Sequence, residues 1–101
     1  MNLISKRAFE KMLAAEDKSA RYHAVGRLSE LDSVESFEMV SNHFKKESDP
    51  HVAFALGINI YKWKSIPSSQ KRDLLISVME KTEPSEALGH LAIALEEEMK
   101  Q

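Results

Sequence analysis

Residues 17–37 read DKSARYHAVGRLSELDSVESF, and they contain two helix starts separated by one tight turn. Asp17 is placed to cap the first helix, because a side-chain oxygen there can accept a free backbone N–H. Apolar residues then recur on one helix face, namely Ala20, Ala24, Val25, Leu28 and Leu31. Asp32 or Ser33 starts the second helix, and Glu35 has the spacing of a capping box. This stretch therefore predicts a helical hairpin.

The same pattern extends outward in both directions, and strand-like alternation is almost absent. A first helix is expected over about 5–16, with an apolar face of Ile4, Ala8, Phe9, Met12 and Leu13. Asp49-Pro50 starts a fourth helix that runs to about 62 or 64. Breaks at 66–69 and 82–85 then delimit a fifth helix and a sixth. The prediction is an all-α protein of six helices.

The second helices of the three hairpins are expected to start near Lys18, Pro50 and Pro84. These starts are about 32 and 34 residues apart, a spacing typical of stacked helical repeats. The residues of the first two hairpins also match at a constant offset of 32 positions. Asp17, Ala20, Ala24 and Leu28 correspond in this way to Asp49, Val52, Leu56 and Ile60. We therefore expect one domain, 1–101, of three antiparallel hairpins at about 3–31, 32–64 and 67–100.

Residues 17–34, then Phe37, Val40 and Phe44, and then residues 49–52 together resemble a HEAT repeat of the short phycobilin-lyase type. Within 17–34, the segments 26–28 and 31–32 echo the turn of that repeat. The resemblance covers roughly 17–63, and it departs from the pattern at Ala53 and at 86–87. It implies a short right-handed α-solenoid of the kind that usually binds proteins, and it implies no catalytic activity.

Composition narrows the class of protein further. A net charge of −2 does not favour general nucleic-acid binding, which needs a strongly basic face. The chain has no cysteine, which excludes disulfides and thiol catalysis and fits a reducing cytoplasm. No signal peptide is recognisable, and no apolar run approaches the length of a membrane-spanning helix. We expect a cytoplasmic protein with no membrane association.

A search for catalytic or metal-binding residues finds no motif. The histidines at 23, 43, 51 and 90 do not have the i, i+4 spacing of a helical metal site. Phosphate-binding glycine loops and the GxSxG nucleophile motif are absent. We therefore expect no enzyme activity, no cofactor and no metal. Arg21 is expected to be structural, paired with Asp17 or Asp49.

The fourth helix carries more apolar surface than one packing face needs. One face holds Val52, Leu56, Asn59, Ile60 and Trp63, and the opposite face holds Phe54, Ile58 and Tyr61. At the repeat offset of 32, positions 22, 86, 90 and 93 share the second face. The candidate protein-binding residues are Tyr22, Phe54, Ile58, Tyr61, His90 and Ile93. The alternative is that the fourth helix is central and buried on several sides.

The sequence thus favours a non-catalytic protein-binding module: a small adaptor, inhibitor or immunity-type protein acting through its inner face. One alternative is nucleic-acid binding through the basic residues Lys45, Lys46, Lys62, Lys64, Lys71 and Arg72, among which acidic residues are interspersed. A self-associating structural homodimer is a second alternative. An enzyme or a chromophore carrier is suggested only by analogy with the family, and the missing motifs argue against it.

Overall fold

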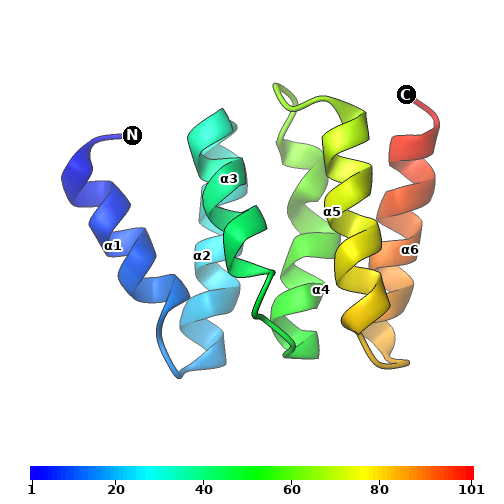
Figure 1. The fold of residues 1–101 in the computed structure, drawn as a ribbon, viewed down its shortest axis with the longest axis horizontal. Helices are drawn as coiled ribbons and strands as arrows, with labels where there is room; N and C mark the ends of the chain where they lie inside the picture. Colours follow the sequence, from blue (N-terminus) through cyan, green and yellow to red (C-terminus); the bar gives the residue numbers. More distant parts are fainter.

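The computed structural model describes all 101 residues and contains helices but no strand (Figure 1). The helices are α1 (Leu3–Leu13), α2 (Lys18–Leu31), α3 (Val34–His43), α4 (Pro50–Asn59), α5 (Ser68–Lys81) and α6 (Glu86–Met99), with a 3-10 turn, η1 (Ile60–Lys62), after α4. Successive helices alternate in direction (Figure 1). The all-α prediction is confirmed, with six α-helices.

Local capping explains most of the helix starts. Asp17 accepts the N–H of Ser19 at 2.9 Å, and Asp49 accepts the N–H of His51 at 2.8 Å. The capping box of α3 joins Ser33 to Ser36, each hydroxyl accepting the backbone N–H of the other. The expected role of Glu35 in that box is therefore wrong. A serine at the third helical position already accepts the N–H that Glu35 would have had to reach.

Four helix boundaries differ from the prediction. α1 begins at Leu3 rather than near residue 5 and ends at Leu13, three residues early. α4 continues as a 3-10 turn rather than as α-helix. α6 begins at Glu86, two residues after Pro84, because Ser85 is its N-cap and accepts the N–H of Leu88. The N-caps Asp17, Asp49 and Ser85 are consequently 32 and 36 positions apart.

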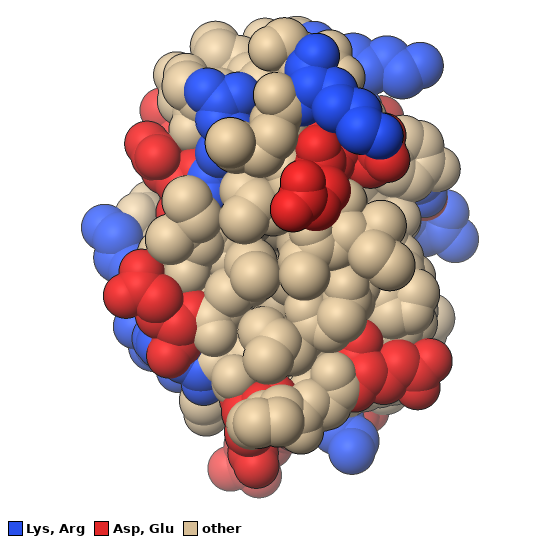
Figure 2. Space-filling view, turned by 90° about the vertical axis from the view of Figure 1, so that its right-hand side faces the viewer, with Lys and Arg blue, Asp and Glu red and all other residues tan.

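The helices form two layers. α2, α4 and α6 lie side by side in one layer, with α4 packed against both neighbours, and α1, α3 and α5 lie on the other side (Figure 1). The molecule measures 36 × 28 × 17 Å, with α1 at one end of the long axis and α5 and α6 at the other. Figure 2 shows that second end, where an uncharged area lies among charged groups.

One cluster of twenty buried apolar residues forms the core. Trp63 at its centre is fully buried, packs edge-on against Phe37, and donates its indole N–H to the hydroxyl of Ser36 at 2.9 Å. This bond satisfies the polar atom of the largest core side chain. The core therefore joins the first turn of α3 to the segment that follows α4.

α1 is the exception to the predicted pattern of burial. Only Leu13 is buried, with Phe9 and Met12 packed partly against the core, while Ile4 is 81% exposed and Ala8 is exposed. The expected apolar face over Ile4–Leu13 is thus wrong in its first half. α1 has one main neighbour, α2, so its contact is narrow. None of the helices has the length and apolar character needed to cross a lipid bilayer.

Candidate functional site

The two apolar faces of α4 differ in how deeply they are buried. Val52, Leu56, Ile60 and Trp63 are fully buried, and Asn59 is buried among them. On the other face Phe54 and Ile58 are half-buried, whereas Tyr61 is 60% exposed. α4 is therefore central in its layer, and the 3-10 turn that follows it presents an aromatic residue to solvent.

Gly57 allows α4 and α6 to approach closely. A Cβ atom at this position would lie 3.1 Å from backbone atoms of His90 and Leu91. One turn earlier, the ring of Phe54 contacts the ring of His90 edge-on, with centroids 4.6 Å apart. The α4–α6 contact therefore includes a close backbone approach at Gly57 and one aromatic pair.

This contact corrects the expected register of the third repeat. The constant offset of 32 matches Phe54 with Glu86 and Ile58 with His90. Counted from the N-caps, Phe54 and His90 are both the fifth residue, and the structure brings their rings together. The four extra residues lie before the 82–85 turn, since α5 has 14 residues where α3 has 10, and a constant offset cannot detect them.

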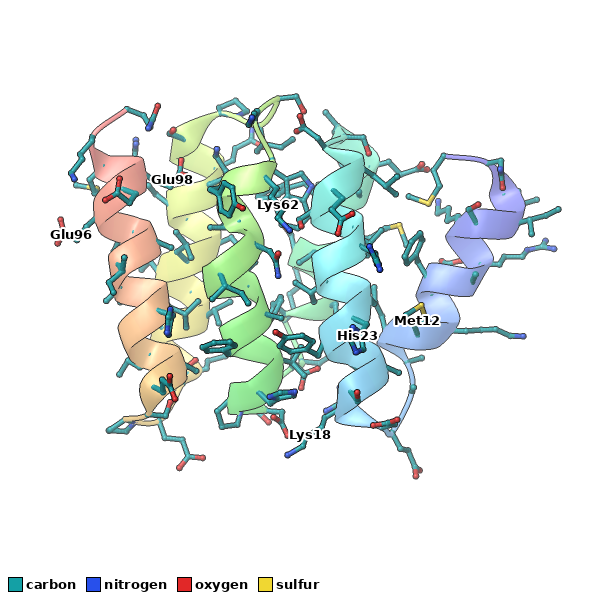
Figure 3. The ribbon with its side chains drawn as sticks, turned by 180° about the vertical axis from the view of Figure 1, so that it is seen from behind. Met12, Lys18, His23, Lys62, Glu96 and Glu98 are labelled. Carbon is teal, nitrogen blue, oxygen red and sulfur yellow. The ribbon has the colours of Figure 1, made fainter.

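Tyr22 reaches the same surface from α2. Its ring stacks on His51 of α4, with centroids 4.5 Å apart and ring planes 18° apart. Figure 3 views this side of the molecule, with α2, α4 and α6 nearest the reader. Tyr22, like Phe54, therefore links neighbouring helices and is only partly available to a partner.

A groove of about 750 Å³ lies where the end of α4 and the following turn face the last turns of α6. Tyr61, His90 and Ile93 from the predicted set line it, and Ile93 is 63% exposed. Tyr22, Phe54 and Ile58 are not among its lining residues. Of the six predicted residues, three thus line a groove that is open to solvent. Tyr22 and Phe54 lie in helix–helix contacts instead, and Ile58 is half-buried outside the groove.

Sequence reasoning missed the ion pair at the base of this groove. Nζ of Lys71 lies 3.2 Å from Oε1 of Glu98 and donates to the carbonyl of Trp63 at 3.0 Å, and both side chains are buried. Ser68 also donates to Glu98, at 2.9 Å. The sequence contains a signal for this ion pair. Helical spacing places Lys71 on the same face of α5 as the buried Leu74, Leu75 and Val78, so a buried lysine that needs a partner could be expected there.

The base of the groove is therefore neutral, and the exposed charges that line it are Lys64 and Glu97. The exposed side chains of Tyr61 and Ile93 line the groove further from its base. Such an arrangement suits an apolar side chain of a partner with polar groups on either side.

A second buried polar cluster lies outside the groove. Nε of Arg21 donates to Glu47 at 2.7 Å, and Nε2 of His43 lies 2.6 Å from the same carboxylate oxygen. Arg21 also donates to the carbonyls of Ala15 and Glu16. The expected pairing of Arg21 with Asp17 or Asp49 is therefore wrong. Glu47, 26 positions away, takes that place because the loop before α4 folds back over α2.

This cluster shifts two pKa values. Burial alone would raise the pKa of Glu47, but hydrogen bonds from Arg21, His43 and the N–H of Asp49, together with the charge of Arg21, lower it overall. The hydrogen bond to Glu47 raises the pKa of Arg21. Arg21 and Glu47 are therefore an ionised pair whose hydrogen bonds are satisfied, as expected of a structural junction.

Two of the six basic residues considered for nucleic-acid binding are engaged inside the protein. Lys71 is buried against Glu98, and Arg72 donates to the carbonyl of Glu98 at 3.1 Å. No group of three or more histidine or carboxylate side chains is arranged to hold a metal ion. Comparison of the chain with protein-family models, curated proteins and solved structures finds no match.

Proposed function

We propose that this chain is a non-catalytic protein-binding module, a HEAT-like right-handed α-solenoid of three hairpins that acts as a small cytoplasmic adaptor or inhibitor. Its contact surface is the α2–α4–α6 face, and the groove beside Tyr61 and Ile93 is the centre of that surface. The observation that carries the proposal is the pair of apolar side chains that line the groove and are more than half exposed. Exposed aromatic and aliphatic groups beside a concave surface are typical of partner sites.

The helix contacts next to the groove support the proposal. Gly57 lets α4 and α6 approach closely, and the Phe54–His90 pair joins the two helices beside the groove, so its walls are formed before a partner arrives. A preformed site avoids part of the entropic cost of ordering loops on binding. We propose that a helix or loop of the partner inserts an apolar side chain between Tyr61 and Ile93.

Site-directed photo-crosslinking tests this function. A benzophenone amino acid at position 61 should capture a defined partner from a lysate of the source cells, identified by mass spectrometry. The matched control carries the same group at Val34, which is 62% exposed on α3 in the other layer. Adding Ile93→Glu to the first variant should abolish capture, because a carboxylate in the groove must be desolvated.

Two results would count against the proposal. One is a crosslinked pattern from position 61 that is the same as that from position 34. The other is capture that survives Ile93→Glu. Circular dichroism of each variant should show unchanged helicity, since both substituted side chains are mostly exposed.

A further inference from the structure

The outer side of α1 combines apolar and basic groups that nothing in the chain covers. α1 turns Phe9, Met12 and Leu13 toward the core, so the 100° spacing of a helix puts Ile4, Arg7, Ala8 and Lys11 on the opposite side. All four are exposed. We call these four residues the α1 end face; it closes one end of the long axis (Figure 1).

The opposite end of the molecule combines apolar and acidic groups. Met99 on α6 is 61% exposed and Ile76 on α5 is 44% exposed. Ala92, two helical turns before Met99 on the same face of α6, is half-buried. Glu96 projects from α6 on the side away from α4 (Figure 3). We call Ile76, Ala92, Glu96 and Met99 the α6 end face. Figure 2 views this end and shows a broad uncharged area with both acidic and basic groups around it.

The charges of the two end faces are opposite and unpaired. Arg7 and Lys11 form no ion pair within the chain, although the neighbouring Lys6 pairs with Glu35. Glu96 likewise has no cationic partner, whereas Glu97 pairs with Lys100 and Glu98 with Lys71. α6 contains four glutamates and no lysine or arginine. Arg7 and Lys11 of the α1 end face are therefore opposite in charge to Glu96 of the α6 end face, and Glu10 of α1 is the one exposed, unpaired acid beside them.

We propose that a second copy of this chain docks its α1 end face on the α6 end face of the first. Ile4 and Ala8 would cover Met99 and Ala92, and Arg7 and Lys11 would lie near Glu96. The two faces are different, so the contact is heterologous, and it leaves one free face at each end of the pair. Copies can therefore add in a row.

The size of the ends limits the strength of this contact. The end of the molecule has a cross-section of 28 × 17 Å, and the roughly 500 Å² this gives is below the ~800 Å² per partner of a standard stable interface. Association is therefore weak and concentration-dependent, with a dissociation constant in the micromolar to millimolar range. Because unpaired surface charges contribute, salt weakens it.

Two end-blocked variants provide the test. Ile4→Glu/Arg7→Glu places acids opposite Glu96, and Glu96→Lys/Met99→Lys places cations opposite Arg7 and Lys11. All four positions are exposed, so helicity should be unchanged. In sedimentation equilibrium up to ~1 mM protein, the wild-type weight-average mass should rise from 11.5 kDa toward at least twice that value. Roughly 0.5 M NaCl should reduce the rise.

Each blocked variant alone should stay monomeric, and an equimolar mixture of the two should associate again, because each supplies the face that the other lacks. Tyr61→Ala should associate like wild type, which separates this contact from the proposed partner groove. The proposal is overturned if wild type remains at 11.5 kDa throughout, or if the mixture remains monomeric. It is also overturned if only one blocked variant loses association, since that identifies a symmetric dimer.

Discussion

Glu47 is the residue at which three segments of the chain meet. Its carboxylate accepts hydrogen bonds from Arg21 on α2, from His43 on α3 and from the N–H of Asp49 before α4. Since the pKa of Glu47 is lowered in the folded state, the unfolded chain binds more protons at low pH and stability rises with pH there. The contribution is complete above about pH 5. It is lost as pH falls through the folded-state pKa.

Replacing Glu47 with glutamine should flatten this pH dependence. We expect the melting temperature of Glu47→Gln to change less than that of wild type between about pH 5 and pH 3. At pH 7 the variant should be less stable by about 1–3 kcal/mol, the range for losing hydrogen bonds to a charged group. Thermal unfolding followed by circular dichroism measures both. Glu97→Gln, an exposed control, should keep the wild-type slope; an equally steep slope in Glu47→Gln would contradict the assignment.

Two glycines in neighbouring helices should respond oppositely to the same substitution. A methyl group at Gly57 meets backbone atoms of α6 at 3.1 Å, and backbone cannot move aside cheaply. Gly57→Ala should therefore destabilise the protein by about 1–3 kcal/mol, as overpacking does. At Gly89 nothing lies within 4 Å of the added methyl, so Gly89→Ala should stabilise by about 0.5–1 kcal/mol through helix propensity. Urea unfolding gives both signs, and a stabilised Gly57→Ala would show that α4 and α6 are not in close contact.

Among the elements, the end of α6 depends on its ion pair with α5. Lys71→Met would leave Glu98 buried without its cation, and we expect a loss of about 3 kcal/mol, the lower end of the range for breaking a buried pair. Fraying of the last turn of α6 can rehydrate Glu98, which keeps the loss from being larger. Lys71→Met/Glu98→Leu should recover to within about 1 kcal/mol of wild type, because no unpaired charge remains.

The double-mutant cycle decides between a coupled pair and two independent groups. Equilibrium unfolding of wild type, Lys71→Met, Glu98→Leu and the double variant supplies its four values. If the two single losses simply add, the pair is not the anchor of α6. Amide exchange in the last turn of α6 should speed up in Lys71→Met and return to the wild-type rate in the double variant.

The whole molecule should not bind duplex DNA. Its net charge is −2, and Lys71 and Arg72 are occupied inside the protein. Non-specific DNA binding comes from phosphate neutralisation by several free cations on one face. Fluorescence anisotropy with a labelled duplex at low salt should show no change up to about 100 μM protein. A signal that falls steeply with added salt would favour the nucleic-acid alternative instead.

The residues that could be predicted from the sequence are those whose interactions lie within about four positions. Asp17, Ser33 and Asp49 start helices because each can accept a nearby free N–H. The buried stripe of Val52, Leu56, Ile60 and Trp63 follows from helical periodicity. Helix content, the main helix starts and the buried face of α4 were therefore determined by the sequence alone.

The tertiary structure alone decided which distant groups meet. Arg21 bonds Glu47 rather than a nearer aspartate, and Phe54 meets His90 because α5 is longer than α3, 14 residues against 10, which shifts the register of α6. Tyr61 is exposed and Phe54 half-buried on the same helix face, since the ring of Phe54 packs against His90 of α6 whereas Tyr61 borders an open groove. Periodicity gives the direction of a side chain around its own helix. What that side chain meets depends on how far the neighbouring helix slides and tilts, which is set by packing over the entire molecule.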